Sequence, residues 1–164
     1  YKAFSKHRKE YIMSGFASGV ELTRVDSSAE FALGQVVTTA DGKTFKYITY
    51  SEEAAAVDGV AGEVAYFVAD NGIMASDVTS DLSASDEIGA GVLQAALSDN
   101  EFGWIQVGGP ATLTLALTAG ADGDPLTPTG SADGTLDVVS GVTDNVCAIA
   151  GDISAKEVLC CFPH

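Results

Sequence analysis

Histidine is almost absent from this chain of 164 residues, which contains only His7 and His164. Nucleophilic catalysis by serine or cysteine needs an imidazole that a rigid scaffold holds in place. Because His7 lies in an irregular stretch and His164 at the last position, we expect neither to be oriented in that way. The sequence therefore predicts no histidine-based active site and favours a protein that is not an enzyme.

Patterns that bind metals or cofactors are also missing from the sequence. Its one cluster of cysteine and histidine spans residues 160–164, where Cys160 and Cys161 would point to opposite faces of a strand. Residues 122–124, Asp-Gly-Asp, begin like a calcium loop but lack the further acids and the terminal glutamate of that motif. No glycine-rich nucleotide-binding motif occurs. We expect neither a metal nor a cofactor.

Positive charge is scarce beyond the first part of the chain. Residues 47–164 contain eighteen acidic residues and a single base, Lys156, whereas residues 1–46 carry a net charge of +2. Binding to nucleic acid requires basic residues that neutralise phosphates. The acidic part of the chain is therefore not expected to bind nucleic acid.

Long apolar runs are absent as well. The sequence contains no run of about 18 apolar residues, which is the length needed to span a bilayer, so no membrane partner is expected. No apolar segment of about 7–15 residues follows the charged start, and the sequence predicts no signal peptide. With 46% hydrophobic and only 19% charged residues, the chain is too apolar to be disordered and long enough for one domain.

Cysteine is limited to three residues, Cys147, Cys160 and Cys161. An odd number close to the C-terminal end does not form a disulfide framework. Mutual pairing of Cys160 and Cys161 is unfavourable if the two lie in one strand. We expect buried, reduced cysteines in a protein made inside a cell.

Carboxylate pairs are plentiful, and a glycosidase needs two carboxylates about 5–10 Å apart across a cleft. Every pair here lies among turn residues, which indicates solvated loops. A carbohydrate-binding or carbohydrate-active protein is accordingly a lesser alternative. The pairs are Asp86 with Glu87, Asp99 with Glu101, and Asp122 with Asp124.

Alternating apolar residues and glycine turns predict an all-β body over residues 31–164. Asp41-Gly42 joins two such runs in a hairpin signal, since a type I′ turn needs positive φ at both central residues. Eight to ten short strands at this spacing predict a small antiparallel β-barrel or sandwich. Residues 52–57 could form a short helix capped by Ser51, and residues 79–91 a loop. The expected strands are 33–39, 44–50, 63–69, 73–78, 92–97, 102–107, 112–118, 135–139, 145–150 and 157–162.

The sequence of residues 1–30 predicts an extended N-terminal arm, because charged residues and glycines are mixed there and apolar residues do not recur at a regular spacing. Four bases fall within the first nine positions with no acid among them. A frayed, solubilising terminus is one interpretation. The aromatic residues and lysine stems favour another, in which the arm contacts another protein. The arm's candidate partner-binding residues are Tyr1, Lys2, Phe4, Lys6, Arg8, Lys9, Tyr11 and Phe16.

Trp104 is the only tryptophan and lies in the apolar run Phe102-Gly103-Trp104-Ile105-Gln106-Val107. A bulky aromatic in a short strand is usually a core residue. Contact with a second subunit is the alternative, and on that basis Trp104 joins the candidate partner-binding residues.

Residues 91–110, Gly-Val-Leu-Gln-Ala-Ala-Leu-Ser-Asp-Asn-Glu-Phe-Gly-Trp-Ile-Gln-Val-Gly-Gly-Pro, resemble small proteins that decorate or cement the capsids of tailed bacteriophages. Three later segments resemble these proteins in the same way: Gly123-Asp124-Pro125-Leu126, Leu136-Asp137-Val138 and Val146-Cys147-Ala148-Ile149-Ala150. The resemblance covers roughly residues 30–162. The long basic arm is not a general feature of that group.

The resemblance implies a virion structural protein made in the host cytoplasm and located on the capsid surface. It implies a homotrimer of small β-barrels or sandwiches that binds the major capsid protein and cements neighbouring subunits of the expanded shell. It carries over no catalytic residues. Another virion component, such as a tail, fibre or head–tail adaptor protein, is the alternative.

Overall fold

The computed structural model describes residues 19–54, 56–69, 71 and 75–164. Within these residues the chain is almost entirely β-structure, with one short 3₁₀-helix, η1 (Leu82–Ala84). None of the helices in this part of the chain has the length and apolar character needed to cross a bilayer. The ten strands are β1 (Val36–Thr38), β2 (Thr44–Tyr50), β3 (Val64–Val68), β4 (Asp77–Thr79), β5 (Ser85–Leu93), β6 (Phe102–Thr112), β7 (Pro125–Thr127), β8 (Asp137–Val138), β9 (Ala148–Ala150) and β10 (Glu157–Cys161).

Five of these strands close into a ring. The pairings run β2–β4–β3–β5–β6, and β6 pairs back with β2, so that a small barrel forms. The predicted all-β fold is thus confirmed, with one difference: β4 runs parallel to β2. A parallel pair needs a long crossover, and here residues 51–76, which include β3, supply it.

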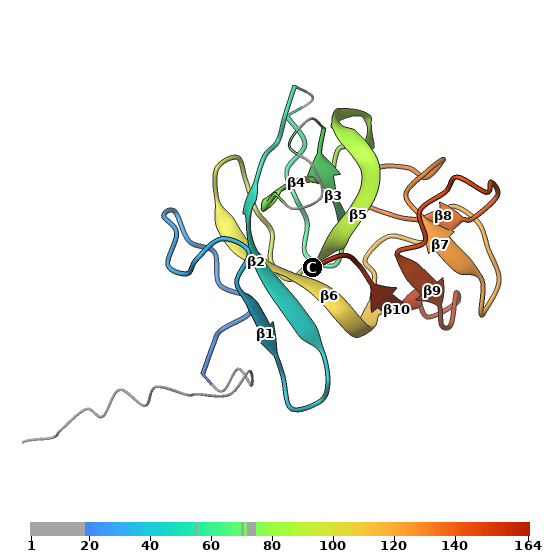
Figure 1. Ribbon diagram of the computed structural model, residues 1–164, viewed down its shortest axis with the longest axis horizontal. Coiled ribbons are helices and arrows are strands. Elements are labelled where there is room, and N and C mark those ends of the chain that lie inside the picture. Colours follow the sequence, from blue (N-terminus) through green and yellow to red (C-terminus); the bar gives the residue numbers. More distant parts are fainter. Residues whose placement is uncertain (1–18, 55, 70, 72–74) are drawn as a thin grey trace, which may run out of the picture.

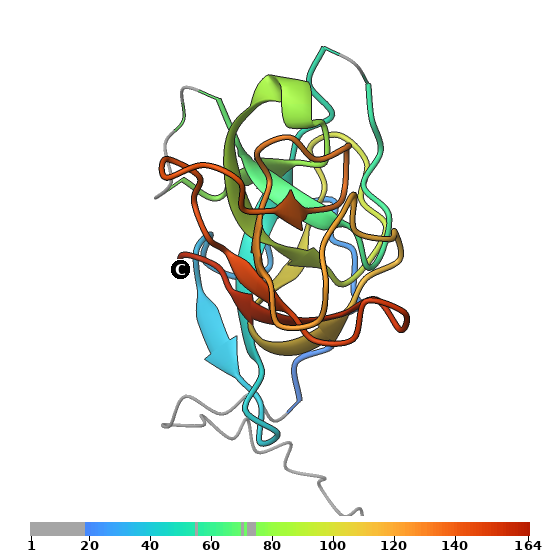
Figure 2. The same ribbon diagram turned by 90° about the vertical axis from the view of Figure 1, so that its right-hand side faces the viewer.

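The second half of β6 leaves the ring and carries a four-stranded extension, which we call the wing: β10, β9, β7 and β8, in that order. Figure 1 shows the wing in orange and red beside the ring, and Figure 2 views it end-on. At the transition Gly109 has φ +85, a left-handed conformation that favours glycine. Its Cα hydrogen also faces Lys43, because a Cβ there would lie 3.2 Å from the Lys43 Cα.

The main hydrophobic core is continuous from the ring into the wing. Ile48 and Phe67 of the ring belong to the same cluster as Leu126, Val158 and Phe162. The core explains why β10 alternates strictly between exposed and buried positions, since the inner residues of that strand pack into the cluster. Ring and wing therefore form one packed body.

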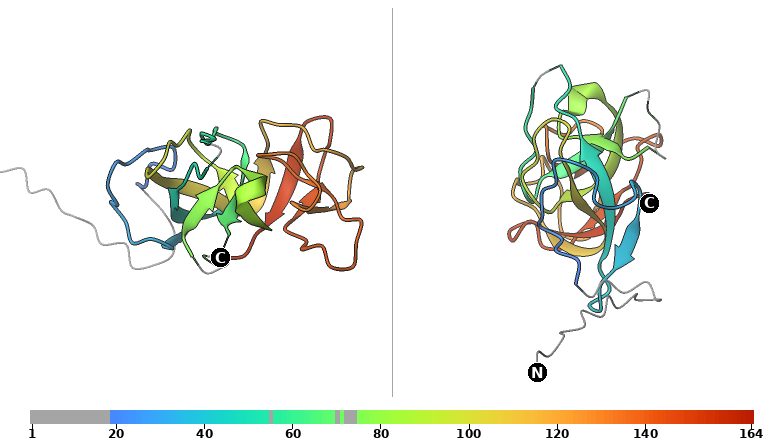
Figure 3. Two further views of the ribbon diagram at one scale, coloured as in Figure 1. Left: turned by 90° about the horizontal axis from the view of Figure 1, so that it is seen from above. Right: turned by 90° about the vertical axis from the view of Figure 1, so that its left-hand side faces the viewer.

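A second, smaller core lies on the outer side of β2 and β6. Phe45, Tyr47 and Trp104 form its buried part, and Val20 and Phe31 are among the residues packed against it. The backbone of this preceding segment also forms a β-bridge between Asp26 and Phe102. The described end of the expected arm therefore lies against the body, and the boundary expected at residue 30 is wrong for residues 20–30. Figure 3 shows this segment, in blue, at the end of the molecule opposite the wing.

Several expected elements differ from the structure, among them the strand expected over 92–97, of which only residues 92 and 93 belong to β5. Residues 113–118 form no strand, because the Leu113 N–H bonds to the Lys156 carbonyl and the next N–H bonds to Gly62. Successive partners on different segments cannot form a ladder. Residues 85–91, expected as a loop, belong to β5. The expected helix at 52–57 does not form in its described residues, where Glu52 and Asp99 exchange backbone-to-carboxylate hydrogen bonds instead.

Candidate functional site

Most of the arm's sequence-predicted binding residues lie outside the described part of the chain. They are Tyr1, Lys2, Phe4, Lys6, Arg8, Lys9, Tyr11 and Phe16. Their proposed role therefore rests on charge and residue type alone.

Trp104 is fully buried, with 0% of its surface exposed. Its ring lies 5.0 Å from that of Tyr47 and 5.2 Å from that of Phe31, between ring centroids. The assignment of Trp104 to a partner-binding surface is therefore corrected: its side chain belongs to the second core and does not reach the surface.

A polar contact fastens the segment before the strands to this second core. The Tyr47 hydroxyl donates to the Asp26 carboxylate at 2.6 Å, and the Arg24 guanidinium donates to the same carboxylate at 2.7 Å. Burial raises the pKa of Asp26, but these two hydrogen bonds outweigh burial and hold the pKa below its ordinary value. Burial and the Asp26 carboxylate raise the pKa of Tyr47. We interpret this contact as structural, because both side chains are buried.

The residues considered for catalysis or metal binding do not assemble into such a site in the described structure. Among the described residues the His164 ring forms one hydrogen bond, between Nδ1 and the Phe162 carbonyl at 3.0 Å, and His7 lies outside the described residues. No group of three or more histidine, cysteine or acidic side chains in the described residues could hold a metal ion. Asp122 and Asp124 accept backbone N–H groups of Ile153 and Ala121, which is the role of loop residues.

The outer face of the wing carries a row of apolar residues across four strands. Pro110 of β6 is opposite Leu159 of β10, Leu159 is opposite Ile149 of β9, and Ile149 is opposite Pro125 of β7. Residues in register share one face of a sheet. Leu159, 47% exposed, lies at the centre of the row on an inner strand of the wing. We call these four residues the docking face.

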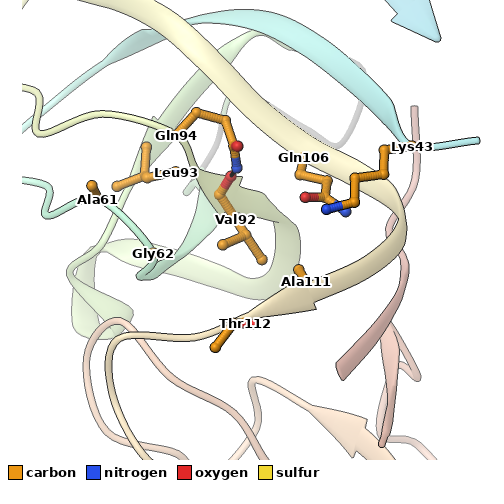
Figure 4. Close-up of a pocket in the computed structure, with 9 residues that line it drawn as sticks. All are labelled: Lys43, Ala61, Gly62, Val92, Leu93, Gln94, Gln106, Ala111 and Thr112. Carbon is orange, nitrogen blue, oxygen red and sulfur yellow. Dashed lines mark hydrogen bonds between the residues drawn. The ribbon is translucent and has the colours of Figure 1, made fainter. Parts of the chain in front are cut away.

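A cleft of about 330 Å³ lies where β6 bends from the ring into the wing. Figure 4 shows Lys43 and Gln106 on one side of it and Gln94 on the other, with Val92 and Ala111 between them. The size is at the lower end of the range for ligand sites. Ala61, Gly62, Leu93 and Thr112 complete the lining.

The two glutamines are held by their amide nitrogens. Gln106 Nε2 donates to the carbonyls of Gly108 and Pro110 at 3.1 and 2.9 Å, and Gln94 Nε2 donates to the Val92 carbonyl at 2.9 Å. Neither Oε1 accepts a hydrogen bond from the described residues. The cleft therefore offers two carbonyl acceptors of fixed orientation.

A smaller cavity of about 240 Å³ continues from this cleft toward the docking face. Lys43, Ala111 and Thr112 line both spaces, and the smaller one adds Pro110 and Glu157. Since Pro110 also belongs to the docking face, the cleft and the face are neighbouring parts of one surface.

Sequence reasoning did not find this surface. Lys43 lies between the expected Asp41-Gly42 turn and the strand expected over 44–50, whereas Gln94 and Gln106 lie in two other expected strands. No local pattern brings these three residues together, because they meet only where β2, β5 and β6 pair. Alternation in β10 could have identified Leu159 as outward-facing, but not its apolar neighbours.

Comparisons with protein-family models, with curated proteins and with solved structures found no significant match. The function of the chain must therefore be argued from its own residues.

Proposed function

We propose that this chain is a virion structural protein that binds the outside of an assembled phage capsid and cements neighbouring major capsid subunits. The observation that carries the proposal is the exposed apolar docking face on a strongly acidic β body. A surface of this kind fits contact with another protein, because interface centres are apolar and depleted in charge.

The charge distribution supports the same proposal. Residues 1–18 carry a formal charge of +3, and residues 19–164 carry −18. The acidic body disfavours a nucleic-acid partner, while the basic segment suits acidic patches on a capsid protein. Several symmetric copies, such as a homotrimer, would add avidity to contacts that are individually weak.

The proposal is tested by occupancy on undecorated capsids assembled from the major capsid protein of the same virus. Leu159→Asp places a charge at the centre of the docking face, and we expect a loss of binding of tenfold or more. Val142→Asp is the matched control, because Val142 is a fully exposed apolar residue outside that face. Full occupancy by the Leu159→Asp protein would rule out this face as the contact.

Deleting residues 1–18 tests the basic segment separately. The deletion ends before Val20, which packs on the second core and should be kept. We expect weaker binding and a smaller dependence of occupancy on salt, since screened charge contacts are removed. Unchanged occupancy and salt dependence would exclude the segment from binding. Imaging of intact particles would distinguish the capsid surface from a tail or adaptor position.

A further inference from the structure

The cleft beside the docking face contains Lys43, the one lysine or arginine among the described residues whose side chain forms no hydrogen bond or ion pair with other described residues. Four basic residues occur in residues 19–164. Arg24 pairs with a carboxylate, Lys46 is buried, and Lys156 donates to a backbone carbonyl. The Lys43 ammonium makes no ion pair or hydrogen bond within the described residues. It lines a cavity on both of its sides.

The position of Lys43 is set by the fold. Its Cα lies above Gly109, and only the absence of a side chain at Gly109 permits this approach. The β2–β6 pairing from Thr44 onward anchors the next residue, with Thr44 opposite Gly108. The Lys43 backbone is thus fixed at the edge of the cleft, and its side chain lines the cleft.

The acceptors of the cleft define what else a ligand must carry. The Oε1 atoms of Gln94 and Gln106 are free to accept N–H groups of a ligand, while Gln106 Nε2 already donates two hydrogen bonds and Gln94 Nε2 donates one. The apolar side chains of Val92 and Ala111 line the same cleft, and Figure 4 shows the end of the Lys43 side chain beside the Gln106 amide. A matching ligand carries a carboxylate, a short apolar stem and neighbouring N–H groups.

We propose that this cleft binds an aspartate or glutamate residue of a partner polypeptide. The carboxylate accepts from the Lys43 ammonium, and the side-chain methylenes lie against Val92 and Ala111. Peptide N–H groups on either side of the acidic residue donate to Gln94 and Gln106. This site goes beyond the proposed capsid function, because it specifies the chemistry of a ligand whatever particle presents it.

The probe is N-acetyl-aspartate N-methylamide, which has one carboxylate and two amide N–H groups. Binding is followed in the full-length protein by NMR at about 0.15 M salt, where charges beyond about 8 Å are largely screened. For a probe of this size we expect a dissociation constant on the order of 1 mM. Shifts should centre on the side-chain amides of Gln94 and Gln106 and on the Val92 methyl groups.

Two related probes separate the parts of the interaction. The neutral asparagine analogue should bind about threefold more weakly or worse, as expected for loss of a partly exposed ion pair. Acetate has the carboxylate but no N–H groups. It should therefore leave the NMR signals of the Gln94 and Gln106 side-chain amides unshifted. Equal shifts of these amides by acetate would reduce the site to a simple anion site and overturn the proposal.

Variants assign the binding to its residues. Lys43→Gln should weaken the aspartate probe about threefold and abolish its advantage over the asparagine probe. Lys156→Gln removes an equal charge outside the cleft. It should leave unchanged both the affinity for the aspartate probe and the advantage of that probe over the asparagine probe. Gln94→Leu should weaken both probes by about fivefold, the usual value of one hydrogen bond. Unchanged affinity in Lys43→Gln, or shifts located elsewhere, would overturn the proposal.

The outcome is independent of the capsid assay. The probe experiment contains no capsid, so a positive result stands even if the capsid proposal fails. Conversely, capsid binding that depends on Leu159 but not on Lys43 would support the docking face and leave the probe experiment to decide the cleft.

Discussion

The Tyr47 hydroxyl donates a 2.6 Å hydrogen bond to the Asp26 carboxylate, across twenty-one residues of sequence. Tyr47 belongs to β2, whereas Asp26 lies in the segment that precedes all the strands. With Arg24 bonded to the same carboxylate, this contact holds residues 20–31 on the second core.

Removing this hydroxyl should destabilise the protein. Tyr47→Phe keeps the buried ring but deprives a buried carboxylate of one donor, which costs about 1–3 kcal/mol. Urea unfolding at pH 7 measures the change in the free energy of unfolding. In a double-mutant cycle, Tyr47→Phe should cost much less in the Asp26→Asn background than in the wild type. Additive losses would contradict a direct coupling.

The stability contributed by Asp26 should depend on pH in one direction. Because the pKa of Asp26 is lower in the folded protein, its ionised form stabilises the fold above the unfolded pKa of about 3.9. That contribution disappears as the pH falls through the folded pKa. The difference in unfolding free energy between wild type and Asp26→Asn should be largest at pH 5–7 and should shrink below pH 4. A difference independent of pH would refute this assignment.

Gly109 should be much less tolerant of substitution than another glycine of similar backbone conformation. Gly109 and Gly123 have φ +85 and +90, but a Cβ at Gly123 meets no atom within 4 Å. Gly123→Ala should cost about 1 kcal/mol from backbone strain, and Gly109→Ala about 2–3 kcal/mol because it also pushes against Lys43. Chemical denaturation of the two variants tests this order. Equal losses would show that Lys43 moves away freely.

The three cysteines should differ sharply in thiol reactivity. Burial raises the pKa of Cys160 to about 12 and raises that of Cys147 as well, whereas Cys161 is exposed. The thiolate is the reactive form, so a thiol reagent at pH 8 should modify one site per folded chain rapidly. Unfolded protein should react at all three. Cys161→Ser should remove the fast phase, and fast reaction of a second thiol would contradict the burial of Cys147 and Cys160.

Local sequence patterns determined several features correctly. The Asp41-Gly42 signal and the alternation after it predicted a hairpin and a strand over residues 44–50, which are the bounds of β2. The turn is not of type I′, because Gly42 has a positive φ and Asp41 does not. Alternation also predicted that Cys160 and Cys161 face opposite sides, and one is buried while the other is exposed. The expectation that all three cysteines are buried is wrong for Cys161. These successes have one cause: a period of two fixes side-chain direction within a strand without any knowledge of its neighbours.

The tertiary structure decided which segments pair. Residues 112–118 alternate as clearly as β2, yet those beyond Thr112 lack a continuous partner strand and form no ladder. Residues 79–91 are rich in serine and aspartate and therefore resembled a loop, but the missing side chains of Gly89 and Gly91 allow Phe162 and Ile105 to pack closely on β5. The burial of Trp104, the docking face and the Lys43 cleft likewise depend on contacts between distant segments. Sequence alone determined the all-β composition and its charge, because both are local. Pairing across the ring and wing is not local, and it alone brings the surface residues together.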